Sequence, residues 1–99
     1  MTGLEMIVEK FRTNVDHKGY DAAHDDAHTD GELCAAANCY FDRAWLQIQG
    51  KDPRTPERPP FLWPFEPEAW KPSDDPVRNL VHAGALIAAE IDRLQRTRC

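Results

Sequence analysis

The sequence lacks any apolar run long enough to cross a membrane. A membrane-spanning helix needs about 20 predominantly apolar residues, and no such stretch occurs among the 99 residues of the chain. The N-terminal apolar positions, where a secretory signal would lie, are interrupted by Glu5, Glu9 and Lys10. We therefore expect a soluble protein that has no membrane partner and works in the cytoplasm.

Cysteine and basic side chains are also scarce. The three cysteines form no Cys-x-x-Cys pair, and the five-residue interval from Cys34 to Cys39 places these two on different sides of a helix. This argues against a disulfide framework and favours a reducing compartment. The 12 basic residues are outnumbered by 17 acidic ones, which gives a net charge of −5. Such a balance argues against nucleic acid as the partner.

Apolar residues at helical spacing predict three main helices, at about residues 2–18, 29–48 and 75–96. The predicted fold is a small all-α bundle in a single domain, residues 1–99. Because so short a chain buries only a modest fraction of its surface, we expect a homodimer or a higher homo-oligomer.

The second and third helices carry the most specific predictions. Thr29 and Glu32 fit a capping box, in which each side chain accepts a hydrogen bond from the backbone N–H of the other residue. Gly84 lies in mid-helix, where glycine predicts a close crossing with a neighbour. The second helix is expected to bury Leu33, Ala36, Ala37, Tyr40 and Ala44. The third is expected to bury Val77, Leu80, Val81, Gly84, Ile87, Ala88, Ile91 and Leu94.

Between the second and third helices, residues 51–73 contain seven of the eight prolines, which exclude regular helix. The same stretch holds four aromatic residues, and disordered linkers are normally poor in aromatics. We therefore predict an ordered, extended arm packed across the helices. Trp63 is expected in the core. Trp70 beside Lys71 is the pocket candidate, because an aromatic face with a cation suits a nucleobase and its phosphate.

The stretch HDDAHTDGEL, residues 24–33, is rich in groups that bind metals or protons. If the helix extends backward, His24, His28 and Glu32 share one face and can bind Zn²⁺ or Mn²⁺. If it begins at Thr29, Asp25 and Asp26 in the preceding loop suit a harder ion. The alternative is a capped, solvated helix start, which accounts for residues 29–32 but leaves residues 24–28 unexplained.

Further polar residues are candidates for phosphate contacts. Arg78 and His82 lie one helical turn apart and can meet a phosphate together. Glu9 and Arg12 on the first helix have a similar spacing. The alternative for all four residues is an ordinary exposed polar face.

Several motifs resemble those of a group of small proteins carried by bacteriophages and prophages. They are His24-Asp25-Asp26-x-His28-x-x-Gly31-Glu32-Leu33, Trp63-Pro64-x-x-Pro67-x-x-Trp70-Lys71-Pro72 and Arg78-x-Leu80-Val81-x-Ala83-Gly84. The resemblance covers nearly the whole chain. It implies a viral protein that acts in the cytoplasm of the host cell.

The helix order and the last helix are also similar to the MazG-like all-α nucleoside triphosphate pyrophosphohydrolases. This resemblance implies a helical bundle, a dimer or tetramer, a nucleotide substrate and Mg²⁺ held by clustered acidic side chains. The EExxE and ExxD helices of that family are not intact in this sequence. Arg78 and His82 stand where the second acidic pair is expected.

Three functional hypotheses follow. The first is a nucleotide-binding protein, in its fullest form a pyrophosphohydrolase dependent on Mg²⁺ or Mn²⁺, with Zn²⁺ as a further candidate. Asp25 and Glu32 would be catalytic. The metal ligands would be His24, Asp25, Asp26, His28 and Glu32. The nucleotide contacts would be Glu9, Arg12, Trp70, Lys71, Arg78 and His82. The second hypothesis is a non-catalytic anti-defence protein that sequesters a host nucleotide signal or binds a host defence protein directly. The third is a protein-binding module, for instance an inhibitor that mimics nucleic acid with its acidic surface. The plainest alternative is a structural or assembly protein without a ligand.

Overall fold

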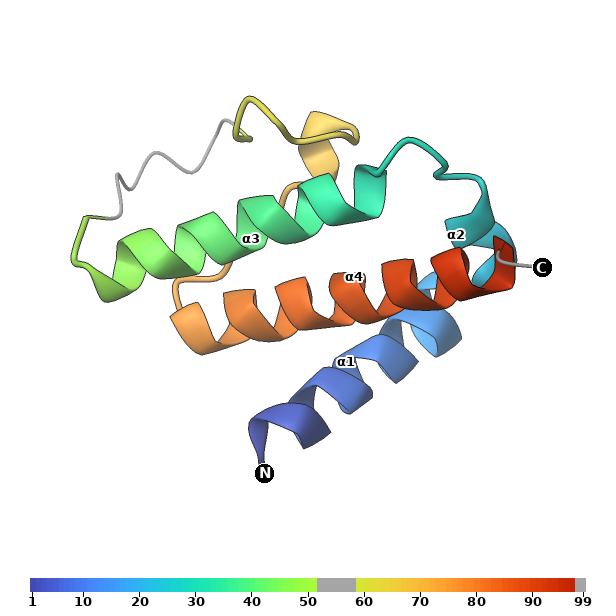
Figure 1. The fold of residues 1–99 in the computed structure, drawn as a ribbon. Helices are drawn as coiled ribbons and strands as arrows, with labels where there is room; N and C mark the ends of the chain where they lie inside the picture. The colour runs from blue at the N-terminus through green and yellow to red at the C-terminus, as the bar shows by residue number, and fades with distance from the viewer. Residues whose placement is uncertain (52–58, 98–99) are drawn as a thin grey trace.

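The computed structural model describes residues 1–51 and 59–97 (Figure 1). These residues form helices and no strand, which confirms the predicted all-α bundle. Residues 52–58 of the predicted arm lie outside the described part of the chain. The helices are α1 (Gly3–Lys18), α2 (Ala22–Asp26), α3 (Glu32–Ile48), the short 3₁₀ helix η1 (Pro67–Ala69) and α4 (Pro76–Thr97).

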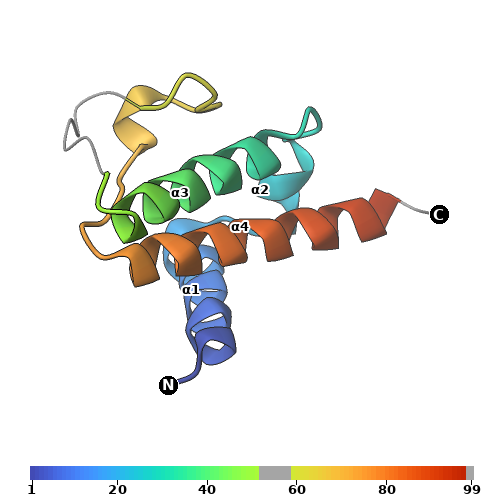
Figure 2. The same cartoon turned by 60° about the vertical axis from the view of Figure 1, so that its left-hand side comes forward.

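Helix α4 is the centre of the fold. It packs against α1, α2 and α3, most extensively against α3. Helices α3 and α4 lie side by side and antiparallel, whereas α1 crosses α4 steeply, with its N-terminal end pointing away from the bundle (Figures 1 and 2). No described helix is long and apolar enough to span a membrane.

The interface between α3 and α4 is built from small residues. All five side chains predicted to be buried on α3 are buried, and Ala83 and Ala89 of α4 are buried as well. Alanine faces let two helices approach closely. The main core cluster joins Ala37, Cys39, Tyr40, Trp70 and Ala83.

The predicted buried stripe of α4 is wrong for its large side chains. Val77, Leu80, Ile87, Ile91 and Leu94 are 38% to 51% exposed. The physical reason is that α3 packs on the alanine-rich side of α4, where large side chains would hold the helices apart. The side chains of α4 that are buried instead are Asn79, Ala83, Ala85, Ala89, Glu90 and Arg93.

The crossing predicted at Gly84 is present. A Cβ atom on Gly84 would lie 2.6 Å from Cδ1 of Ile7, so glycine is what allows α1 to cross α4 at this point. Helix α1 itself begins with a capping box between Thr2 and Glu5 and ends at Gly19, which has a left-handed backbone with φ of 70°.

The predicted capping box of the second long helix is wrong. Helix α3 begins at Glu32, and its N-cap is Gly31, with φ of 81° and no side-chain cap. The carboxylate of Glu32 instead accepts a hydrogen bond from the N–H of Asp30, at 2.6 Å. Because a helix cannot run backward through a residue at positive φ, residues 22–26 form a separate short helix capped by Asp21.

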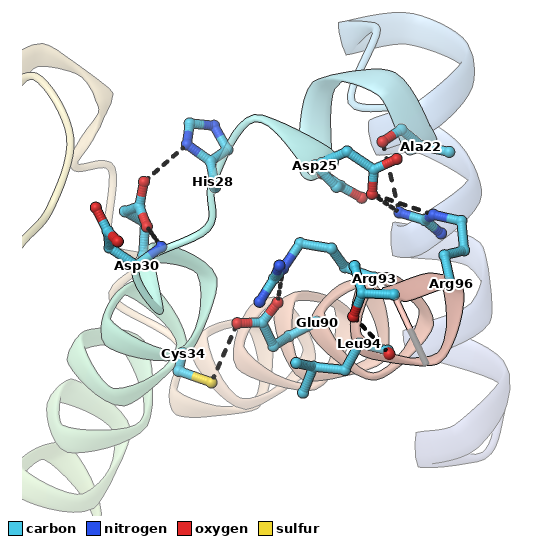
Figure 3. Close-up of polar contacts among 12 residues, drawn as sticks. Ala22, Asp25, His28, Asp30, Cys34, Glu90, Arg93, Leu94 and Arg96 are labelled. Atoms are coloured by element: carbon cyan, nitrogen blue, oxygen red, sulfur yellow. Dashed lines mark hydrogen bonds and ion pairs between the residues drawn. The ribbon is translucent and has the colours of Figure 1, made fainter. Parts of the chain in front are cut away.

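Polar contacts fix both ends of α4. At its start, buried Asn79 donates to the Gln47 side chain and to the Ser73 carbonyl, and accepts from the Ser73 N–H, all within 2.9 Å. Near its end, Glu90 and Arg93 form a buried ion pair, and the Cys34 thiol donates to Glu90 from α3 (Figure 3).

Candidate ligand-binding cavity

A cavity of about 900 Å³ is lined by residues from all four α-helices and the arm. Sites for small molecules in proteins typically measure about 300–1,000 Å³. The end of α1, the residues around α2 and the residues before η1 supply much of its wall, while α3 and α4 contribute Tyr40 and His82. The cavity is therefore formed by segments that lie far apart in the sequence.

Seven rings that line the cavity contact one another in series. The order along the wall is Tyr20, His24, His28, Phe65, Trp63, Tyr40 and His82, which we call the ring cluster. Neighbouring ring centroids are 3.9 to 5.7 Å apart, the separation at which aromatic pairs attract each other. The contacts hold these side chains in fixed positions around the cavity.

Both tryptophans of the arm contact the core cluster, Trp70 as a member and Trp63 packed against it, so the predicted core role of Trp63 is met in part. Trp70, the pocket candidate, is only 7% exposed and belongs to the core. Trp63, the core candidate, is half-buried and lines the cavity. The N–H of Lys71 donates a hydrogen bond to the Tyr40 hydroxyl at 3.3 Å, which anchors the arm to α3.

His82 is neutral at pH 7. Burial in the cavity wall, reinforced by the positive charges of Lys10 and Lys18, lowers its pKa from 6.5 to about 4. Its ring is stacked on the ring of Tyr40, and the two ring centroids are 3.9 Å apart. A neutral imidazole at this place can both stack against a planar ligand and form a hydrogen bond with it.

Charged and polar groups interrupt the apolar wall. Lys18 and Lys71 border the cavity, as do the carboxylates of Asp25, Glu66 and Glu68. Asn14 also borders it, and its side-chain oxygen is buried without a hydrogen-bond partner. A buried polar atom of this kind costs free energy until it is paired, so Asn14 provides a place for a ligand or water to donate.

The five predicted metal ligands are divided among separate contacts. Nδ1 of His24 pairs with buried Asp25 at 3.1 Å, and Nδ1 of His28 pairs with Glu32 at 3.3 Å. Asp26 pairs with Arg96 of α4 at 2.8 Å. Figure 3 shows His28 and Arg96 well apart. No group of three or more His, Cys, Asp or Glu side chains in residues 1–51 and 59–97 is placed to share an ion.

The metal therefore has no preassembled ligand set in the described part of the chain, and it stays a prediction. His24, Asp25 and His28 do line the cavity. Hydrogen bonds from backbone N–H groups at the start of α3, with a smaller effect of His28, hold the pKa of Glu32 below its usual value. Glu32 is thus a stabilised carboxylate at a helix start.

Four of the six predicted nucleotide contacts, Glu9, Lys71, Arg78 and His82, line one smaller groove of about 420 Å³. Lys71 and His82 line the cavity. Arg12 lies with Glu9 along the outer side of α1, and Trp70 belongs to the core cluster. Sequence reasoning did not assign Lys18, Tyr20, Tyr40 or Phe65 to the site. The high aromatic content of the arm was the signal that pointed towards part of this set.

No family model, curated protein or solved structure matches the chain. Rings that stack, two lysine amines that can meet an anion and an unpaired amide oxygen together suit a planar ligand that carries a negative charge.

Proposed function

We propose that the cavity binds a nucleotide or a nucleotide-derived small molecule. The observation that carries the proposal is the ring cluster lining a 900 Å³ cavity that Lys18 and Lys71 also border. Stacking of a base on an aromatic side chain contributes about 1–3 kcal/mol per base. The lysine amines provide the charge that a phosphate requires.

Binding without chemistry is better supported than hydrolysis. Of the two carboxylates predicted to be catalytic, Asp25 lines the cavity and Glu32 does not. The side chains predicted to hold the metal are engaged with different partners. The favoured use of the cavity is therefore sequestration of a nucleotide, as in the anti-defence hypothesis. Hydrolysis, MazG-like ancestry and a phage origin stay predictions.

The test is a mass-spectrometric assay of the purified protein with a pool of linear and cyclic nucleotides, with and without Mg²⁺ or Mn²⁺. The filtrate is analysed before and after heat denaturation. We expect one nucleotide to be missing from the filtrate and to return intact on heating. Products that form only with the metal would show hydrolysis instead, and their loss in Asp25→Ala would assign the carboxylate. A pool left unchanged contradicts both functions.

The contribution of Lys71 is tested by comparing Lys71→Ala with Lys51→Ala. Both side chains are exposed, but Lys51 does not line the cavity. We expect Lys71→Ala to raise the Kd for the retained nucleotide roughly ten- to hundredfold, because a hydrogen bond to a charged group is worth about 1.5–3 kcal/mol. Lys51→Ala should bind as the unaltered protein does. Equal Kd values for the two variants would remove Lys71 from the site.

A further inference from the structure

The groove of about 420 Å³ adjoins the cavity. Lys71 and His82 line both hollows, so these two side chains form a shared border. The rest of the groove is formed by α1, by the end of the arm and by the first turns of α4, the helix that α1 crosses in Figure 2. A ligand held in the cavity can therefore extend past the border into the groove.

The border is held in place by a residue of the core. Tyr40 is 1% exposed, and its ring stacks on His82. Its hydroxyl accepts the hydrogen bond from the N–H of Lys71. One buried side chain thus positions both residues of the border, and the point at which the rings of the cavity give way to the groove is fixed by the core.

The groove has an excess of positive charge in a protein that is acidic as a whole. Lys10, Lys71 and Arg78 line it, together with the carboxylate of Glu9. The whole chain, in contrast, has a net charge of −5. A hollow lined mainly by one sign of charge concentrates the electrostatic potential and attracts ligands of the opposite sign. The lining of the groove therefore suits an anion.

Lys10 carries a positive charge that the fold does not compensate. Its side chain is half-buried, and no carboxylate in residues 1–51 and 59–97 forms an ion pair with it. Burial, reinforced by the positive charge of Lys18 nearby, lowers the pKa of Lys10. After burial, the same two lysines are the further causes of the low pKa of His82, so both ammonium groups lie near the border. A bound anion would offset this repulsion between like charges.

The other polar groups of the groove are paired within the chain. Asn79 is buried, and its side chain exchanges hydrogen bonds with the backbone of Ser73 and donates one to Gln47. Lys71 and Arg78, in contrast, are exposed. The basic side chains are therefore the groups of the groove that a ligand can reach and pair with.

We propose that the groove is the phosphate site of the ligand bound in the cavity, and that this ligand is a nucleoside di- or triphosphate. Its phosphate chain extends past Lys71 to reach Lys10 and Arg78. Arginine suits this role, because its planar guanidinium can bind two phosphate oxygens at once. The inference rests on the proposed function, since it requires a base on the ring cluster. A nucleotide with one phosphate would leave Lys10 and Arg78 without a contact.

Isothermal titration calorimetry without divalent metal ions tests the proposal. The probes are ATP, GTP, CTP and UTP, the four matching monophosphates and inorganic tripolyphosphate. For the base that binds, we expect the triphosphate to bind at least tenfold more tightly than the monophosphate, roughly the effect of one charged hydrogen bond. Lys10→Gln and Arg78→Ala should each raise the Kd of the triphosphate roughly tenfold or more and leave that of the monophosphate unchanged.

Lys51→Gln is the matched control, because it removes one positive charge that lines neither the cavity nor the groove. It should leave both Kd values unchanged. Arg78 is exposed, so Arg78→Ala leaves the core intact, and circular dichroism reports the folding of each variant.

The outcomes separate this inference from the proposed function. Equal binding of the tri- and monophosphates, or an equal effect of Arg78→Ala on both, overturns the phosphate site and leaves a nucleotide in the cavity. Tripolyphosphate that binds as tightly as the triphosphates would make the groove an independent anion site, which also overturns the inference. Binding of no nucleotide at all overturns both proposals.

Discussion

His82 shows how one residue can join the core to the cavity. It is stacked on Tyr40, a fully buried side chain, and its own ring lines the cavity. Protonation would place a third positive charge near Lys10 and Lys18, which is one reason why its pKa is about 4. The neutral ring therefore keeps this wall of the cavity suitable for stacking at physiological pH.

The stability of the folded state should depend on pH through His82. Between pH 6.5 and 4 the unfolded chain binds a proton at this residue and the folded chain does not. The free energy of unfolding therefore falls as the pH is lowered through this window, by roughly 2–3 kcal/mol in full. The measurement is urea unfolding, followed by circular dichroism, between pH 7.5 and 4 at one protein concentration.

The matched variant for this prediction is His82→Phe, which keeps a ring on Tyr40 but cannot be protonated. Groups other than His82 also titrate in the window, so the informative quantity is the difference between the two proteins. We expect the unaltered protein to lose stability relative to His82→Phe as the pH falls. A difference that stays constant with pH would show that His82 does not titrate in this way.

At the level of helices, the faces of α4 differ in what they contact. Small residues meet α3, Gly84 meets Ile7 of α1, and the large apolar residues are left exposed. The close crossing at Gly84 comes at a cost, since glycine in a helix interior is about 1 kcal/mol less favourable than alanine.

Gly84→Ala should lower stability in the unaltered protein and raise it when Ile7 is also alanine. In the first case the new Cβ atom would lie 2.6 Å from Cδ1 and 2.9 Å from Cγ1 of Ile7. Relieving that overlap costs about 1–3 kcal/mol, more than the gain in helix propensity. With Ile7→Ala the overlap disappears, and a gain of about 1 kcal/mol remains.

Urea unfolding of the unaltered protein, both single variants and the double variant gives the coupling between the two sites. We expect a coupling of about 2 kcal/mol. All four proteins are compared at one protein concentration. The same effect of Gly84→Ala in both backgrounds would mean that Ile7 does not restrict this position.

The sequence pattern could predict the helices and one of their buried faces. The stripe from Leu33 to Ala44 is both apolar and closely spaced, and it is buried. On α4, periodicity marked the large apolar residues, but it could not tell a face covered by this chain from one left exposed. The alanine face was overlooked because small residues give a weak hydrophobic signal.

The candidate site could be predicted only in part, for a related reason. His24, Asp25, His28, Lys71 and His82 were singled out and do line the cavity. The predicted metal site requires either one continuous helix or an acidic loop before Thr29. The positive φ of Gly31 instead separates α2 from α3. The ring cluster depends on how the arm folds over α3, which no local spacing specifies.

For the molecule as a whole, the homodimer expected from the short sequence predicts a concentration-dependent melting temperature. Because two chains dissociate when the dimer unfolds, the Tm should rise by about 4 °C for each tenfold increase in protein concentration. Differential scanning calorimetry over a hundredfold range provides the measurement. A constant Tm for the unaltered protein would contradict a dimer.

The central position of α4 also has a consequence for folding during synthesis on the ribosome. The first three helices of this sequence leave the exit tunnel before α4, the helix against which all of them pack. Until residues 76–97 emerge, Tyr40 and the alanines of α3 have no surface to cover them. Folding must therefore wait until α4 has left the tunnel, and the nascent chain is a natural client for chaperones until then.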